Sequence, residues 1–211
     1  MVRDPSAIEP DAGCAACARL VDYRVANRSA HSGHHNAPVR SFGPLDAEIL
    51  VVGLAPGLHG ANRTGRPFTG DYAGDLLYPT LLTFGLGRGA YGQTADDGVA
   101  LTRCRITNAV RCVPPHNKVV GEEIRACNPF LAAEIGAMDN LRHIVALGHV
   151  AHNAVLKALG KTQSAFAFAH GARHELGGGL RLADSYHCSR YNTNTGRLTE
   201  EMFHAVFRAI V

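Results

Sequence analysis

The chain has 211 residues, a formal net charge of +3 and 46% hydrophobic residues, which suits one α/β-sized domain and argues against disorder. No apolar run approaches the roughly 20 residues of a membrane-spanning helix, so we expect no membrane association. The N-terminus lacks the basic start and apolar core of a signal peptide. We therefore expect a cytoplasmic protein whose cysteines stay reduced unless they bind a metal or react. We also expect a monomer.

The N-terminal segment, residues 1–45, contains the pair Cys14 and Cys17 and a predicted helix over about 17–27. Histidines follow at positions 31, 34 and 35, among Ser, Gly and Pro residues that are typical of a loop. Three histidines so close together could bind a metal, although a solvated loop is the simpler interpretation.

Apolar strands alternate with amphipathic helices along the rest of the chain. We expect strands over 47–53, 104–110, 143–147 and 181–186, helices over 72–86, 121–138, 149–159 and 199–210, a loop over 85–98, and a polar loop with a possible hairpin over 160–180. This order predicts a three-layer α/β/α fold with a mainly parallel four-stranded central sheet, in a single domain that spans residues 1–211.

Three polar loops follow the predicted strands, at 53–75, 111–118 and 187–198. Ligands of parallel α/β sheets bind beyond the carboxyl ends of the strands, so these loops should converge on one crevice. The first loop is far longer than the usual ~2–6 residues of a strand-to-helix connection. It also carries many functional side chains, so it predicts a site.

Four of the six cysteines form a metal-ligand pattern, a Cys-x2-Cys pair at Cys14 and Cys17 followed by Cys112 and Cys127. Four thiolates complete either a zinc site or an iron–sulfur cluster, and their spacing alone does not choose between these. The alternative is that they are small buried hydrophobic residues.

Together these segments resemble the uracil-DNA glycosylase superfamily, most closely its type 5 branch. The resemblance extends from Cys14 to the last helix and is carried by Gly-Leu-Ala-Pro-Gly at 53–57 and by residues 59–71, 109–118 and 187–199. It implies a glycosylase that excises uracil, and other bases such as hypoxanthine, from single- or double-stranded DNA and leaves an abasic site. It also implies a [4Fe–4S] cluster on Cys14, Cys17, Cys112 and Cys127 that tethers segment 1–45.

The resemblance also implies roles in the site. His187 would stabilise the charge that develops on the departing base. Phe68 would stack on that base, and the alternative is a core phenylalanine that anchors the loop. The early positions of the first loop offer no side chain that could orient water, which makes Asp71 the candidate, although it could instead only cap the following helix. Asn108 and Asn117 compete to read the base edge, since an asparagine offers both a donor and an acceptor.

The remaining candidates line the pocket or face DNA. We expect catalytic roles for Asp71, His187 and Asn117; substrate contacts from Gly53, Ala55, Pro56, Gly57, His59, Phe68 and Asn108; and DNA contacts from Asn62, Arg63, Arg66, Arg190, Tyr191 and Arg197. No lysine is well placed for a Schiff base, which predicts a monofunctional enzyme. Two alternatives are a catalytically silent iron–sulfur DNA-binding protein and a cysteine-ligated metalloenzyme that acts on free nucleosides.

Overall fold

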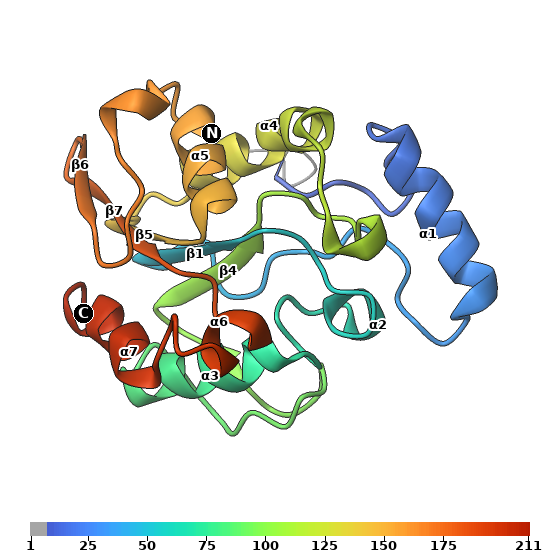
Figure 1. The fold of residues 1–211 in the computed structure, drawn as a ribbon, viewed down its shortest axis with the longest axis horizontal. Helices are drawn as coiled ribbons and strands as arrows, with labels where there is room; N and C mark the ends of the chain where they lie inside the picture. Colours follow the sequence, from blue (N-terminus) through green and yellow to red (C-terminus); the bar gives the residue numbers. More distant parts are fainter. Residues whose placement is uncertain (1–7) are drawn as a thin grey trace.

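The computed structural model describes residues 8–211, which fold around a five-stranded sheet of order β4-β1-β5-β7-β6 (Figure 1). The strands of this sheet are β1 (Ile49–Gly53), β4 (Cys104–Asn108), β5 (His143–Leu147), β6 (Arg173–Gly177) and β7 (Leu180–Ser185). The first, second, third and fifth of these pair in parallel, as the sequence predicts, because helices connect them.

The prediction of four strands is one short. β6 adds an antiparallel edge strand beside β7, through a hairpin whose turn contains Gly177, Gly178 and Gly179 with φ of 92°, 62° and 81°. Only glycine adopts such angles without a steric penalty, so the three glycines themselves determine the conformation of this turn. The strand itself is Arg-His-Glu-Leu-Gly, with a polar composition typical of an exposed edge, and for this reason the sequence predicts only a possible hairpin there.

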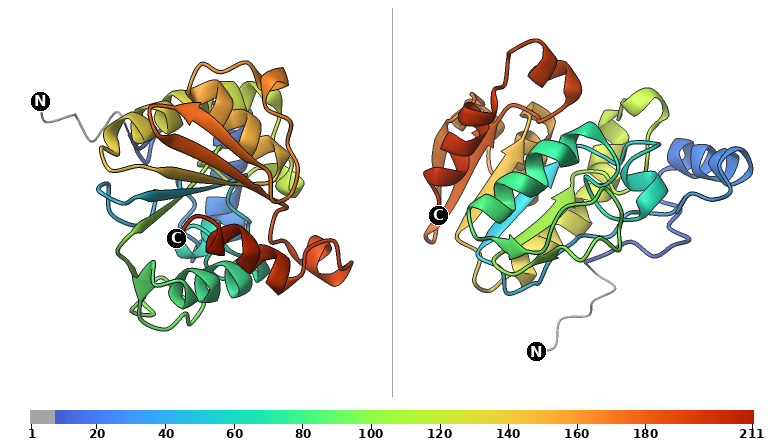
Figure 2. Two further views of the ribbon diagram at one scale, coloured as in Figure 1. Left: turned by 90° about the vertical axis from the view of Figure 1, so that its left-hand side faces the viewer. Right: turned by 90° about the horizontal axis from the view of Figure 1, so that it is seen from below.

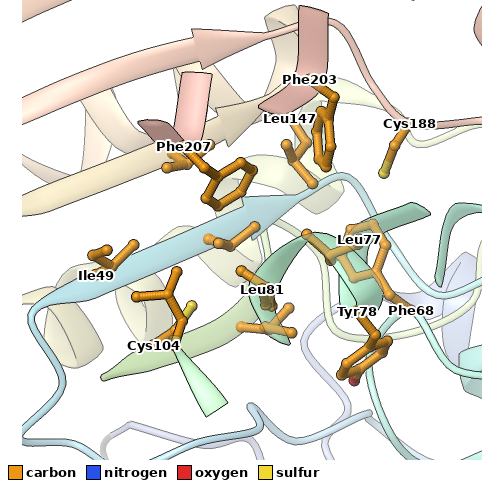
Figure 3. Packing of buried hydrophobic residues seen from close by; sticks show 14 of the residues in the cluster. Ile49, Phe68, Leu77, Tyr78, Leu81, Cys104, Leu147, Cys188, Phe203 and Phe207 are labelled. Atoms are coloured by element: carbon orange, nitrogen blue, oxygen red, sulfur yellow. The ribbon is translucent and has the colours of Figure 1, made fainter. Parts of the chain in front are cut away.

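Two helical layers cover the two faces of the sheet (Figures 1 and 2). Alternate residues of β1 point to opposite faces. Ile49 and Val51 join the apolar cluster under α3 and α7, whereas Leu50 and Val52 join the cluster under α4 and α5. Figure 3 shows the first cluster. The helices of these layers are α3 (Tyr72–Thr83), α4 (Gly121–Ala137), α5 (His149–Ala158) and α7 (Glu200–Arg208).

The other elements lie in the loops and at the N-terminus. They are α1 (Ala18–Ala30), α2 (Ala61–Thr64), α6 (Arg190–Asn194), the 3-10 turns η2 (Pro115–Asn117) and η3 (Gln163–Ala165), and the pair β2 (Gly87–Arg88) and β3 (Ala100–Leu101). The antiparallel β2–β3 pair corrects the prediction of plain loop over 85–98, since two residues are too few for a sequence pattern. Thr199 caps α7 as predicted, by accepting a hydrogen bond from Met202 N at 3.2 Å.

A buried ionic network joins the N-terminal segment to the sheet and α4. The carboxylate of Glu134, fully buried, accepts from Arg105 Nε and from Arg111 Nη2, each at 2.6 Å. Both arginines also bind Glu9, at 3.0 and 2.8 Å. Because each buried charge is paired, the network holds Arg111, and hence the neighbouring Cys112, in one position. No helix within residues 8–211 is both long enough and apolar enough to cross a membrane.

Candidate active site

A cavity of about 400 Å³ opens where the three predicted loops meet, beyond the carboxyl ends of β1, β4 and β7. The expectation that these loops converge is confirmed. The wall of the cavity is formed by residues from all three loops and the start of α3: Leu54, Ala55, Pro56, Gly57, Asp71, Tyr72, Ala73, Pro114, Asn117, His187, Ser189 and Arg190. A cavity of this size suits one small planar ligand.

Gly53, Asn108 and Phe68 meet at the end of β1. Gly53 pairs with Asn108 across the strands, and a Cβ atom on Gly53 would overlap Asn108 Oδ1 and lie 2.7 Å from Phe68 Cε2. Phe68 is buried with φ of 54°, a strained value for a bulky residue. Tyr91 Oη holds this backbone by donating to Phe68 O at 3.2 Å. The chain therefore accepts local strain to place this ring against Gly53 and Asn108.

Asn108 Oδ1 is buried and has no hydrogen-bond partner among residues 8–211. A buried acceptor without a partner costs about 1–3 kcal/mol, and such atoms in native proteins are commonly completed by a ligand or water. Asn108 Oδ1 is thus an acceptor that no described residue uses. Asn108, Phe68 and Gly53 are buried and are not among the residues that line the cavity, although the Phe68 ring packs near His187, which does line it.

Replacing Gly53 with alanine is expected to destabilise the protein by about 1–3 kcal/mol, because the added methyl group has no space beside Phe68 and Asn108. Denaturant unfolding measures this difference. Gly136→Ala is the control, since a Cβ atom there meets nothing within 4 Å and alanine favours a helix. Unchanged stability of Gly53→Ala would contradict the packing described here.

His187 lies two residues beyond β7 and stacks near Phe68, with ring centroids 5.9 Å apart and an interplanar angle of 27°. Burial lowers the pKa of His187 to about 4, so the imidazole is neutral near pH 7. The backbone carbonyl of His187 accepts from Asn192 Nδ2 at 2.8 Å, which holds the loop in place. A neutral ring in this position can donate a hydrogen bond into the cavity.

Asp71 caps α3 and also lines the cavity. Its Oδ1 accepts from Ala73 N at 3.2 Å, so the capping role that the sequence left open exists. The Asp71 carboxylate packs against Gly60 and Gly57. A Cβ atom on Gly60 would overlap Asp71 Oδ2, and one on Gly57 would lie 3.3 Å from it. Burial raises the pKa of Asp71, against the lowering effect of the backbone N–H groups of Gly74 and Ala73. Asp71 lies in the cavity wall, where its carboxylate can meet water or a ligand.

Asn117 is exposed and lines the cavity, as Asp71 does. It comes from the loop that follows β4. It and His116 both have left-handed backbone angles, with φ of 57° and 55°. Tyr72 and Ser189 also line the cavity and were not among the predicted site residues. In the sequence, Tyr72 stands out only because it follows Asp71, and Ser189 only because it lies in the loop that begins at His187.

Two predicted DNA contacts are wrong. Arg66 is only 4% exposed, because its guanidinium forms a two-point ion pair with Asp97 at 2.8 and 2.6 Å. It also packs over the Tyr78 ring, 4.9 Å from the centroid. Asn62 is fully buried and donates to Asn36 Oδ1 at 2.9 Å. Both residues hold the first loop in shape and cannot reach a phosphate.

His59 is placed outside the cavity wall, although it was predicted to contact substrate. It is exposed and its ring lies 5.4 Å from that of His31 and 5.7 Å from that of His34. The first loop therefore contacts the N-terminal segment here.

The other predicted DNA-facing residues lie on the surface. Arg63, Arg190, Tyr191 and Arg197 are all exposed, and Tyr191 is 71% exposed, which is unusual for an aromatic residue. Arg190 lies over the Tyr72 ring at 5.3 Å and Arg197 over the Tyr186 ring at 4.5 Å. These contacts orient the two guanidinium groups while leaving them accessible to an anionic ligand, and Arg190 also lines the cavity.

A second, small cavity is lined by the four cysteines of the metal-ligand pattern: Cys14, Cys17, Cys112 and Cys127. Burial, with a smaller effect of the neighbouring cysteines, raises the pKa of the Cys17 thiol to about 11. Burial likewise raises the pKa of the Cys112 thiol to about 12. Arg24 Nη1 lies 3.5 Å from Cys112 Sγ, and Arg111 N donates to Cys127 Sγ at 3.4 Å. Four sulfurs around one cavity, with cationic and amide donors behind them, fit a thiolate-bound metal group.

The fold and the cavity define a three-layer α/β protein whose ligand site lies beyond the carboxyl ends of its strands and includes the exposed Arg190. A family model described as "Uracil DNA glycosylase superfamily" matches residues 40–211. The chain belongs to the uracil-DNA glycosylase superfamily.

Individual relatives point to one branch of this superfamily. A type-5 uracil-DNA glycosylase from Thermus thermophilus is 48% identical over 195 residues, which cover 90% of this chain and 89% of that protein. One from Pyrobaculum aerophilum is 44% identical over 92% of this chain and 86% of its own length. A type-4 uracil-DNA glycosylase from the same organism is 35% identical over 62% of this chain and 59% of its own length. The similarity to the type 5 branch is thus both higher and more complete.

Proposed function

We propose that this protein hydrolyses the N-glycosidic bond of uracil in DNA and leaves an abasic site. The observation that carries this proposal is the unpaired, buried Asn108 Oδ1 near the Phe68 ring, which in turn packs near His187 in the wall of the cavity. The edge of uracil presents an N–H donor between two carbonyl acceptors. An asparagine amide complements that edge, and the aromatic ring supplies a stacking face for a base that has left the duplex.

Each residue then has a distinct role in bond cleavage. Breaking the bond leaves negative charge on the departing base, and the neutral imidazole of His187 donates a hydrogen bond to the base carbonyl oxygen that carries it. The sugar develops positive charge, which the Asp71 carboxylate stabilises while it orients the attacking water. Between the competing asparagines we assign the base edge to the buried Asn108, and positioning at the cavity mouth to the exposed Asn117.

Replacing Asp71 with asparagine is expected to lower uracil excision about 100-fold, because the amide cannot stabilise the cationic sugar or polarise water. Asparagine caps a helix as well as aspartate does, so α3 should keep its cap and stability should change little. Single-turnover excision from a labelled oligonucleotide, with the unfolding midpoint measured in parallel, tests both parts. Unchanged excision would mean that Asp71 serves only as the helix cap.

The range of substrates extends, in our proposal, to other deaminated bases such as hypoxanthine, in single- or double-stranded DNA. The cavity volume of about 400 Å³, within the usual range for ligand sites, supports this breadth. The enzyme is monofunctional, because none of the three lysines (Lys118, Lys157 and Lys161) is among the residues that line the cavity. The exposed residues Arg63, Arg190, Arg197 and Tyr191 would contact the DNA.

Incubation of the protein with matched oligonucleotides that contain uracil, hypoxanthine or thymine tests the proposal directly. We expect release of uracil and hypoxanthine, no release of thymine, and intact abasic strands until alkali is added. Retention of uracil in every single- and double-stranded context would reject the glycosylase and favour a silent DNA-binding protein.

We further propose that Cys14, Cys17, Cys112 and Cys127 hold a [4Fe–4S] cluster, which ties segment 1–45 to the loop after β4. Their shared cavity and its donors, Arg24 and the Arg111 amide, support this assignment. Bound there, the cluster supplies a cross-link and takes no part in hydrolysis. Visible charge-transfer absorbance and an iron count distinguish it from zinc, which would be colourless.

A further inference from the structure

A second group of metal-ligating side chains lies under α5, apart from the cavity and the four cysteines. It consists of His152 of α5, His174 of β6 and Asp184 of β7. His152 is 1% exposed and Asp184 is fully buried. His152 Nδ1 lies 2.8 Å from Asp184 Oδ1, and His174 Nε2 lies 3.1 Å from Asp184 Oδ2. One ligand atom from each of the three residues falls within 4.8 Å of the other two.

The second contact of His152 decides where its proton is. Its Nε2 lies 2.9 Å from the backbone carbonyl oxygen of Phe166, which can only accept, so Nε2 carries the hydrogen. A neutral imidazole has one N–H group, which leaves a lone pair on Nδ1. That lone pair faces a carboxylate oxygen at 2.8 Å. Two acceptors do not attract each other, so this contact requires a cation between them.

The cation is either a proton or a metal ion. Among the ion pairs of the described residues, those of Asp184 are with His152 and His174 alone, so no arginine or lysine supplies the charge. A metal-binding histidine usually donates its other N–H to a carbonyl or carboxylate, and His152 is oriented in this way by Phe166. Two imidazoles and one carboxylate are a ligand set that zinc uses and that non-haem iron(II) also uses.

We propose that His152 Nδ1, His174 Nε2 and Asp184 bind one divalent zinc ion. Ligand bonds of ~2.0–2.2 Å in a tetrahedral arrangement separate neighbouring ligand atoms by about 3.3 Å. The separations of 2.8 and 3.1 Å involve different oxygens of Asp184, and the three ligand atoms lie within 4.8 Å of one another, so the side chains must rotate for each pair to reach this value. The side chain of His174 is 15% exposed, which provides a path for entry and a place for a water as the fourth ligand.

The ion would join α5 to the β6–β7 hairpin, which follows it in the chain. His152 is 32 residues from Asp184, and His174 lies on the edge strand of the sheet. It would therefore fix the β6–β7 hairpin to α5. Asp184 lies three residues before His187, so the same ion would also steady the end of the strand that delivers this residue.

Zinc binding to the purified full-length chain tests this site. We expect the wild type to bind one more zinc ion per chain than His174→Ala in equilibrium dialysis, or to bind it at least about 100-fold more tightly, since loss of a mere outer-shell partner already costs about 10–100-fold. His149→Ala is the matched control, because His149 is an exposed histidine on α5 and lies outside the cluster, with its ring 6.4 Å from that of His152. It should bind zinc like the wild type.

Zinc on the cysteines cancels in this comparison, because all three proteins keep the same cysteines. Equal zinc content and affinity in the wild type and His174→Ala would overturn the proposal and leave a proton in the cluster. Should His174→Ala fail to fold, X-ray absorption of the wild-type zinc decides. A shell that includes imidazole and carboxylate oxygen supports the site, and a shell of sulfur alone overturns it.

Discussion

Replacing His187 with alanine is expected to slow uracil excision by about 100- to 1,000-fold, the usual effect of removing one donor that stabilises developing negative charge. The ring lies at the cavity wall, near Phe68, and no other histidine lines that cavity among the described residues. Single-turnover excision measures the bond-breaking step without product release. The Michaelis constant should change little, since the interaction strengthens only as the bond breaks.

The pH profile separates this role from a merely structural one. Because the pKa of His187 is about 4, the ring stays neutral between pH 5 and 8 and should cause no fall in rate across that range. An unfolded histidine titrates near 6.5, so the unfolded state binds the proton first. Stability should therefore fall by up to about 3 kcal/mol as the pH decreases from about 6.5 to 4, and His187→Ala should lack this part of the decrease. A rate that depends on a group with pKa near 6.5, lost in the variant, would contradict the neutral-donor role.

Loss of the proposed cluster is expected to have the largest effect on stability. Replacing Cys112 with alanine should abolish iron binding and lower the free energy of unfolding by several kcal/mol (roughly 3–5 or more), since metal binding to a structural site contributes directly to folding. The N-terminal segment should become more accessible to protease, because the cluster would join its Cys14 and Cys17 to Cys112 and Cys127. The contacts of Arg19 and Glu9 with the loop after β4 and with α4 would remain.

A buried cysteine outside the cavity provides the control for this experiment. Cys104 is fully buried in the cluster under α3 and α7, so Cys104→Ala removes a similar volume without touching the proposed ligands. This substitution should lower the free energy of unfolding by only about 1 kcal/mol, and the variant should still bind iron. Equal destabilisation by both substitutions, with no iron in the wild type, would show that the four cysteines are only small apolar residues.

Patterns local in the sequence determined the layered fold and the position of the site. Continuous apolar runs identified the four parallel strands, and helical spacing identified α3, α4, α5 and α7. The loops that follow β1, β4 and β7 had to meet, because parallel strands bring their carboxyl ends to one edge. The Cys-x2-Cys pair likewise placed two thiols together, and the spacing of the other two cysteines completed the pattern.

Only the tertiary structure decided which polar side chains are buried. Arg66 had the sequence setting of a DNA contact, yet Asp97, 31 residues later, neutralises it in the interior. His152, His174 and Asp184 carried no motif, because α5, β6 and β7 bring them together from separate parts of the chain. Burial and pairing of charges depend on partners that are remote in sequence, and no periodicity in the sequence encodes them.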